Sequence, residues 1–255
     1  MTSTAAMPDA TAEAAHRAYR GRRLRPLDAL RAFRRLVADK EDTVQVFEIM
    51  NALSGDATPR GYARLSRQAG GIAFARPELA TMFSDEAWLA QFAPGTVGAA
   101  YCAFMSRERL SADGLAEDNR RIEPFIDAPH VYAWYARRIR DIHDVWHVLT
   151  GYGRDALGEA CIVSFSWAQT GNLGFGFIGL GAALEIRKGA RHIPARRAVL
   201  EAWRHGRKAA WLPGEDYAAL FAEPLEAARR RLNIPEPQVY LSVPAEVRGR
   251  LTLQG

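Results

Sequence analysis

Two histidines and an aspartate lie close together in one segment of the chain, as His143, Asp144 and His147. Apolar residues recur every three or four positions from Val131 to Trp146, which is typical of an amphipathic helix. On a helix each residue advances by about 100°, so with His143 at zero, Asp144 lies at about 100° and His147 at about 40°. All three side chains therefore point into one sector. Imidazole and carboxylate groups are ligands for zinc, and two histidines with one carboxylate also suit ferrous iron.

A fourth candidate ligand follows on the next predicted helix. The residues Gly151-Tyr152-Gly153 stop the first helix, Asp155 is a suitable N-cap for the second, and Glu159 lies in its first turns. An antiparallel return would turn the Glu159 carboxylate towards His147. Histidines four apart also occur as hydrogen-bonded core residues. In that case, however, two carboxylates and two imidazoles would be buried between apolar helices with no ion to offset the cost of burying their charges. We therefore predict one divalent-metal site, formed by His143, Asp144, His147 and Glu159.

The wider segment resembles the signature of a known family. The run His143-Asp144-Val145-Trp146-His147-Val148-Leu149-Thr150-Gly151, followed by Gly158-Glu159-Ala160, is similar to the His-Asp-x-x-His-x(11)-Glu hallmark of the Coq-four family of ubiquinone-biosynthesis proteins. The segments Pro94 to Tyr101 and Arg229 to Ile234 are also similar in character to that family. The likeness covers roughly residues 30 to 245.

The resemblance implies an all-helical fold, an apolar groove for a long polyprenyl tail, and a zinc-type site at the four motif residues. It also implies an enzyme of ubiquinone biosynthesis, a metal-dependent carboxy-lyase that acts on a polyprenylated 4-hydroxybenzoate precursor. This enzyme would remove the carboxylate from ring carbon one, either by simple decarboxylation or coupled to hydroxylation of that carbon. Glu159 is a candidate base for that reaction. The alternative is a non-catalytic scaffold that binds an isoprenoid or quinone lipid and organises the other ubiquinone-biosynthesis enzymes.

Several choices stay open at this point. Three protein ligands with a water indicate a catalytic ion, whereas a closed shell of four ligands indicates a structural one, and four candidates fit both cases. The sequence does not decide between zinc and ferrous iron. It also leaves open the prenyl length, whether the lipid is related to ubiquinone, and whether the chain forms a homo-oligomer.

The elements that must position the site are predicted to be helices. Apolar residues recur at helical spacing from Leu27 onward, with Pro and Gly between the segments. We expect helices near residues 27–37, 46–53, 60–68, 85–92, 96–110, 129–150, 155–171, 195–210, 215–221 and 223–232. Only Gln238 to Val243 alternates like a strand, and it is too short and solitary to build a sheet. The prediction is an all-α fold with a flexible basic tail over residues 1–25. A single multi-helix, Coq-four-like domain then covers 26–255, with the metal site between two consecutive helices.

Residues 169 to 184 contain further features. The run Gly174-Phe175-Gly176-Phe177-Ile178-Gly179 has the letters of a dinucleotide-binding motif, but that motif must follow a strand and open a helix. We interpret Leu173 to Leu184 as a close-packed apolar segment whose glycines admit a neighbouring helix, a flat hydrophobic tail or the bilayer. Gln169 and Asn172 are either hydrogen-bonding residues of the cavity or helix-capping residues.

Charge and composition indicate the location of the protein and the kind of surface it contacts. The net charge is +5, and eight arginines gather early in the chain: Arg17, Arg20, Arg22, Arg23, Arg25, Arg31, Arg34 and Arg35. This cluster is suited to an anionic membrane surface, although a solvated face explains it equally well. Nucleic acid is not expected, because no base-stacking aromatic pattern accompanies the arginines. Two cysteines exclude a disulfide framework, and no segment has the length of a signal or spanning sequence. We expect a bacterial-type cytoplasmic protein that associates peripherally with membranes.

Overall fold

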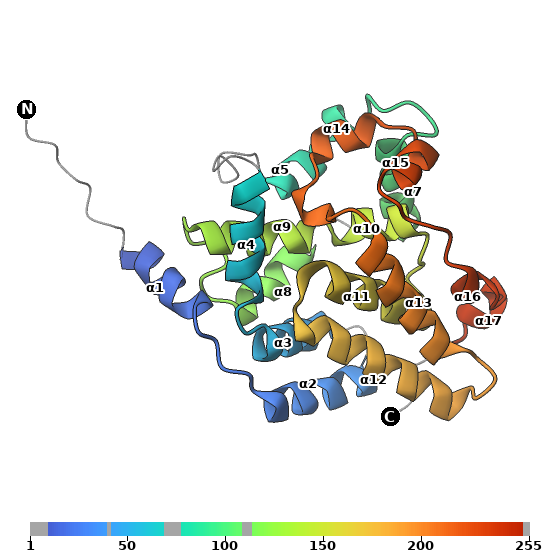
Figure 1. Cartoon of the computed structure of the whole chain (residues 1–255), viewed down its shortest axis with the longest axis horizontal. Helices are drawn as coiled ribbons and strands as arrows, with labels where there is room; N and C mark the ends of the chain where they lie inside the picture. The colour runs from blue at the N-terminus through green and yellow to red at the C-terminus, as the bar shows by residue number, and fades with distance from the viewer. Residues whose placement is uncertain (1–9, 40–41, 69–77, 109–113, 252–255) are drawn as a thin grey trace, which may run out of the picture.

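The computed structural model describes residues 10–39, 42–68, 78–108 and 114–251, which form helices arranged around α11 (Figure 1). In chain order the elements are α1 (Ala10–Tyr19), α2 (Pro26–Ala38), α3 (Thr43–Leu53), α4 (Ala57–Gln68), α5 (Leu79–Phe83), α6 (Glu86–Leu89), α7 (Val97–Glu108), α8 (Gly114–Ile122), α9 (Val131–Asp141), α10 (His143–Thr150), α11 (Ala156–Thr170), α12 (Leu173–Gly189), α13 (Ala195–Lys208), the 3-10 helix η2 (Leu212–Gly214), α14 (Tyr217–Ala222), α15 (Leu225–Arg231), α16 (Gln238–Leu241) and α17 (Ala245–Arg248). These residues contain no strand, so the expected all-helical class is confirmed for the described part of the chain.

Helix α11 forms the centre of the core. Asp155 caps its start by accepting hydrogen bonds from the backbone N–H groups of Leu157 and Gly158 at 3.1 and 3.0 Å. Gly171 ends it with a φ of 71°, in the left-handed region that glycine adopts without strain. Most side chains of α11 are buried, because α12 and α13 pack along its length. A helix that is apolar on all sides needs such cover.

Glycines let α12 and α13 approach α11 closely. A Cβ atom added at Gly179 of α12 would clash with the Ser164 hydroxyl, and one added at Gly206 of α13 would lie 2.6 Å from the Phe165 carbonyl oxygen. The glycines of the 174–179 run therefore serve helix packing. Their helix follows another helix and not a strand, so the context that a dinucleotide motif requires is missing here.

The single helix expected over residues 129–150 consists of two helices, α9 and α10, which meet at Ile142. The backbone of Ile142 has φ −83° and ψ −3°, at the edge of the helical region. Its N–H still bonds the Arg138 carbonyl at 3.2 Å, and its carbonyl still accepts from the Trp146 N–H at 3.1 Å. The helix is thus interrupted without loss of these bonds, and α10 begins at His143.

Residues 10–19 correct part of the expectation of a flexible basic tail over residues 1–25, of which residues 1–9 lie outside the described part of the chain. They form α1, which packs against α9 and buries Ala15 and Tyr19. The Arg22 guanidinium lies 4.4 Å from the centroid of the Tyr19 ring and bonds the Glu123 carboxylate at 2.6 Å. Part of the early arginine cluster therefore belongs to the fold, because it covers an aromatic side chain and pairs with a distant acid.

Two other expectations concern later segments. Leu173 to Leu184, predicted to be close-packed and apolar, belongs to the 17-residue helix α12. Gln238 to Leu241, at the start of the alternating segment, is one helical turn, α16. Among the described residues no helix is both long enough and apolar enough to cross a membrane.

Candidate metal centre

The four predicted ligands lie at the starts of two consecutive helices. His143 and Asp144 open α10, and His147 follows one turn later. Gly151, with a φ of 77°, ends α10, and the short connection to the Asp155 cap brings the first turn of α11 back to the histidines. Glu159, four residues past that cap, is thereby placed beside them. The predicted antiparallel return explains why residues twelve apart in sequence meet.

Three of the four groups lie at the mutual distances of a metal shell. His147 Nε2 is 3.3 Å from His143 Nε2 and 3.6 Å from Glu159 Oε2, and His143 Nε2 is 3.9 Å from the same oxygen. Ligands about 2.0 to 2.2 Å from a tetrahedral zinc ion would be about 3.3 to 3.6 Å apart. The donor atoms and their spacing therefore fit a zinc-sized divalent ion with only a few tenths of an ångström of adjustment.

Asp144 is also close to the two histidines. Ligand atoms of Asp144, His143 and His147 are all within 4.8 Å of one another. Asp144 can thus bind an ion after a small side-chain movement, or it can orient a histidine while a water or substrate takes the fourth position.

The orientation of His147 is fixed by its surroundings. Its Nδ1 lies 2.9 Å from the carbonyl oxygen of Tyr152, which can only accept, so Nδ1 carries the hydrogen and Nε2 presents a lone pair to the site. The imidazole also stacks on Phe104, with ring centroids 5.4 Å apart and planes at 20°. The side chain of His147 is 1% exposed, compared with 23% for His143 and 36% for Glu159. The site is therefore deep at His147 and open at the other two residues.

The charge states of the ion-free chain follow from this arrangement. Burial and the nearby His147 lower the pKa of His143, which favours its neutral form. Burial also disfavours the charged form of His147, but the Glu159 carboxylate outweighs it, so the pKa of His147 is raised. Burial acts against ionised Glu159 as well, yet His147 and then His143 and Arg154 lower the pKa of Glu159 to about 2. Glu159 is thus ionised and suited to binding a cation.

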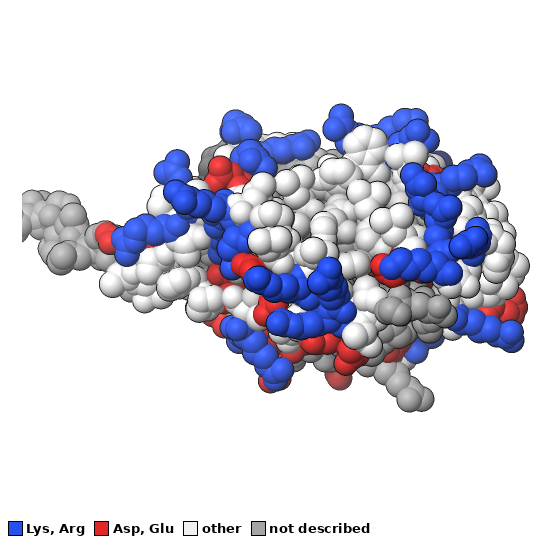
Figure 2. Space-filling model, turned by 90° about the horizontal axis from the view of Figure 1, so that it is seen from below, with Lys and Arg blue, Asp and Glu red and all other residues white. Residues whose placement is uncertain are grey.

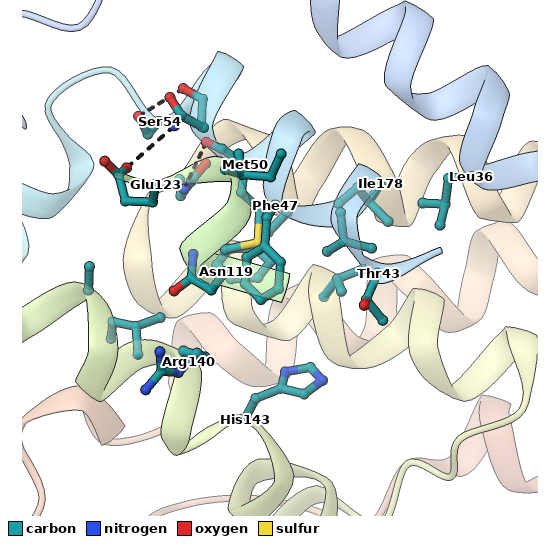
Figure 3. Close-up of a pocket in the computed structure, with 18 of the residues that line it drawn as sticks. Leu36, Thr43, Phe47, Met50, Ser54, Asn119, Glu123, Arg140, His143 and Ile178 are labelled. Carbon is teal, nitrogen blue, oxygen red and sulfur yellow. Dashed lines mark hydrogen bonds between the residues drawn. The ribbon is translucent and has the colours of Figure 1, made fainter. Parts of the chain in front are cut away.

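A cavity of about 270 Å³ opens beside these residues and runs between α3, α8, α9, α11 and α12 (Figure 3). His143, Asp144 and Glu159 line one end of it. The wall is mainly apolar and includes Leu36, Val46, Phe47, Met50, Ile126, Ile139, Val163, Phe175, Ile178 and Ala182. The polar end and the apolar wall suit an amphiphilic ligand with a long hydrophobic part.

Two arginines, Arg140 and Arg154, lie near the candidate metal ligands. Arg140 is 6% exposed and pairs with Asp141 through Nε and NH2 at 2.8 and 2.7 Å. Its NH1 nitrogen is buried with no hydrogen-bond partner, and the residue lines the cavity. Arg154, which sequence reasoning missed, places Nε 3.3 Å from Glu159 Oε1. Its position in the α10–α11 connection, five residues before Glu159, was the available signal.

Gln169 and Asn172 are held by structural contacts. Asn172 caps α12, its side chain accepting from the Gly174 N–H at 2.8 Å, and it also lines the cavity. Gln169 donates to the carbonyl oxygens of Gly206 and Ala210 and accepts from the Leu212 N–H. Capping is therefore confirmed for Asn172, while Gln169 joins α11 to the end of α13.

The fold and the site together define a class of protein: an all-helical chain whose imidazole and carboxylate cluster opens onto an apolar cavity. The family model described as "Coenzyme Q (ubiquinone) biosynthesis protein Coq4" matches residues 64–238, which include all four predicted ligands. The chain belongs to this family. The match is narrower than the resemblance expected over roughly 30 to 245, and it leaves α1 to α3 and the arginine cluster outside.

Curated relatives carry the same family name. The mitochondrial ubiquinone biosynthesis protein COQ4 homolog of Danio rerio is 29% identical over 185 residues, which are 71% of this chain and 65% of that protein. The Homo sapiens homolog is 28% identical over 185 residues, 71% of this chain and 66% of that protein. The chain thus spans about two thirds of the length of these relatives.

A solved structure supports the fold. The crystal structure of a Nostoc punctiforme protein, provisionally named for ubiquinone biosynthesis, matches with a TM-score of 0.58 and 18% identity over 84% of this chain and 100% of that chain. At this identity the likeness concerns the helical fold alone.

Proposed function

We propose that the chain is a metal-dependent decarboxylase of ubiquinone biosynthesis that removes the carboxylate from ring carbon one of a polyprenylated 4-hydroxybenzoate. The observation that carries the proposal is the triangle of His143, His147 and Glu159 at one end of an apolar cavity. In a simple decarboxylation the carboxylate leaves as carbon dioxide and a proton replaces it on the ring. In the oxidative form one oxygen atom of dioxygen enters the ring as a hydroxyl group, and the other is reduced to water by a two-electron donor that is supplied in addition to the substrate.

The metal would be held by His143, His147 and Glu159, with Asp144 within reach. A bound zinc or ferrous ion supplies positive charge that binds a carboxylate or phenolate and stabilises negative charge developing on the ring. Glu159 acts as a ligand in this proposal, since its lowered pKa suits cation binding and makes it a weak base. His147 keeps its Nε2 available because the Tyr152 carbonyl holds the hydrogen on Nδ1.

Arg140 and Arg154 supply the positive side chains of the polar end. The unpartnered NH1 of Arg140 is suited to the ring carboxylate, because a buried cation gains most when it meets an anion that fits it. Arg154 holds the outer oxygen of Glu159 and keeps Oε2 turned to the histidines. The apolar wall from α3 and α12 would bury the prenyl tail, at about 0.8 kcal/mol for each methylene.

A non-catalytic scaffold remains the second candidate. The position of Asp144 favours it, because a closed shell of four protein ligands is typical of a structural ion. The cavity would then hold an isoprenoid or quinone lipid while other ubiquinone-biosynthesis enzymes, recruited as partners, perform the chemistry. Both candidates include peripheral association with an anionic membrane, where such lipids reside.

One experiment separates the two candidates. Purified protein is analysed for its metal and then assayed with zinc or ferrous iron on 4-hydroxy-3-geranylbenzoate labelled with carbon-13 in the carboxylate. If the protein is the enzyme, the wild type releases labelled carbon dioxide, and Glu159→Gln binds the compound but releases no labelled carbon dioxide. Binding of the compound without release of carbon dioxide by the wild type, with either metal, in air and with ascorbate as the electron donor, supports the scaffold.

The role of Arg140 is tested by binding alone. Arg140→Gln should weaken binding of 4-hydroxy-3-geranylbenzoate by about 10- to 100-fold, in line with loss of a hydrogen bond to a charged group. Binding of 2-geranylphenol, which lacks the carboxylate, should change little. Arg137→Gln is the matched control, since Arg137 pairs with Glu78 and does not line the cavity. Equal weakening of both compounds would refute carboxylate recognition by Arg140.

A further inference from the structure

Exposed leucines form stripes on two neighbouring helices. On α12, Leu173, Leu180 and Leu184 are 45%, 53% and 52% exposed, and they lie at helical spacing on one side. On α2, Leu27 and Leu30 are 67% and 39% exposed. We call these five residues the leucine face. Isolated surface leucines need no explanation, but a grouped set is typical of a surface that meets an apolar partner.

The two stripes belong to one surface. The Phe33 ring of α2 packs against α12 so closely that a Cβ atom at Gly181 would clash with it, and its centroid lies 5.5 Å from that of Phe177. The opposite sides of both helices are buried. Figure 1 shows α2 and α12 at the lower edge of the molecule, and Figure 2, seen from below, shows a broad uncharged area there.

Basic side chains border the leucine face. Figure 2 shows Lys and Arg around the uncharged area, with few acidic residues among them on the upper part of this view. Arg31 and Arg34 on α2 and Arg187 and Lys188 at the end of α12 are all exposed. Asp28 is the acid of α2, and it pairs with Arg31 at 2.9 Å. Leucines edged by arginine and lysine are the pattern of helices that lie in the interface of an anionic bilayer.

We propose that the leucine face docks on an anionic lipid bilayer, with α2 and α12 lying along the membrane surface. The leucines enter the boundary between headgroups and acyl chains, and Arg31, Arg34, Arg187 and Lys188 contact lipid phosphates. This inference rests on the proposed function, which already includes peripheral association with an anionic membrane. It goes further in assigning the membrane contact to α2 and α12, and not to the early arginines alone.

The same two helices connect the leucine face with the cavity. Leu36 of α2 and Phe175, Ile178 and Ala182 of α12 line the cavity from the inner side, while the leucine face occupies the outer side. A bilayer against this surface would therefore lie one helix layer from the apolar wall. A long apolar ligand would have only a short distance to cover between the membrane and the site of His143.

Vesicle binding tests the docking directly. Full-length protein is sedimented with vesicles of phosphatidylcholine alone or mixed with phosphatidylglycerol. We expect the wild type to bind the anionic vesicles, and Leu180→Glu/Leu184→Glu to lower the partition coefficient by at least about tenfold. Leu241→Glu is the matched control, because this 42% exposed leucine lies on α16, outside the leucine face. It should bind as the wild type does.

Further variants separate the contribution of the arginines from that of the leucines and provide an alternative if one variant misfolds. Arg31→Glu/Arg34→Glu should weaken binding to the anionic vesicles and leave the weak binding to neutral vesicles unchanged. Leu27→Glu, a change at the most exposed leucine, repeats the test if the double variant of α12 does not fold. Binding of the leucine variants at the wild-type level would overturn the proposal. So would a wild type that does not bind vesicles but forms a dimer that these variants dissociate.

Discussion

Replacing His147 with alanine should abolish tight metal binding and leave a folded protein. The variant loses the hydrogen bond to the Tyr152 carbonyl, worth about 1 kcal/mol, and the packed imidazole on Phe104, worth about 1 to 2 kcal/mol. A loss of about 2 to 3 kcal/mol is smaller than the usual 5 to 15 kcal/mol of a domain. At about 2 to 4 °C for each kcal/mol, the ion-free variant should melt roughly 4 to 12 °C below the wild type.

The effect of metal on the melting temperature distinguishes lost binding from lost stability. Zinc at about one hundred times its Kd should stabilise the wild type by about 2.7 kcal/mol and raise its Tm accordingly. His147→Ala should show no rise, whereas His205→Ala, which removes an imidazole from α13 outside the site, should keep the full rise. Calorimetry with and without zinc measures the melting temperatures, and elemental analysis measures the bound metal. A rise of wild-type size in His147→Ala would refute the site.

Three other predictions concern the site and the packing that holds it. Glu159→Gln should bind a prenylated ligand nearly as well as the wild type but lose decarboxylation, as measured by isothermal titration and carbon dioxide release, because the amide is a poorer metal ligand. Zinc affinity should fall as the pH decreases towards and below 6.5, since the raised pKa of His147 lets a proton compete for Nε2, and titrations across that range check it. Gly206→Ala should lower the free energy of unfolding by about 1 to 3 kcal/mol in urea titrations, because its Cβ meets the Phe165 carbonyl, whereas Gly249→Ala, with ordinary space, should be near neutral. If Glu159→Gln or Gly206→Ala behaved as the wild type does, or if zinc affinity did not change with pH, the contact on which that prediction rests would be contradicted.

The clustering of the four candidate ligands was predictable because their placement is local. His143 and His147 share a helix face by spacing alone, and the Gly151 stop and Asp155 cap fix the turn that returns Glu159 to them. The interruption at Ile142 was not predictable, since no proline or glycine marks it. It moves the start of α10 to His143 without disturbing the i, i+4 relation.

The remaining parts depend on contacts between distant segments. Phe47 from α3 and Asn119 from α8 line the cavity, and no local pattern links them to the histidines. Residues 1–25 were expected to be a tail because they are small, polar and basic and are followed by Pro26. Ala10–Tyr19 is nevertheless a helix, because α9 and Arg22 cover Tyr19. The leucine face likewise exists only because α2 packs beside α12.

The charges around the site favour an anionic ligand. Asp144 and Glu159 lie in the first turns of α10 and α11, where helix dipoles stabilise negative charge, so these two carboxylates would balance the charge of a divalent ion. Asp141 pairs with Arg140 at 2.7 Å and balances its charge. Arg154 adds a further positive charge beside Glu159. With an ion bound, the polar end of the cavity would therefore be positive, and a ring carrying a carboxylate or phenolate would neutralise it, whereas an uncharged isoprenoid would not.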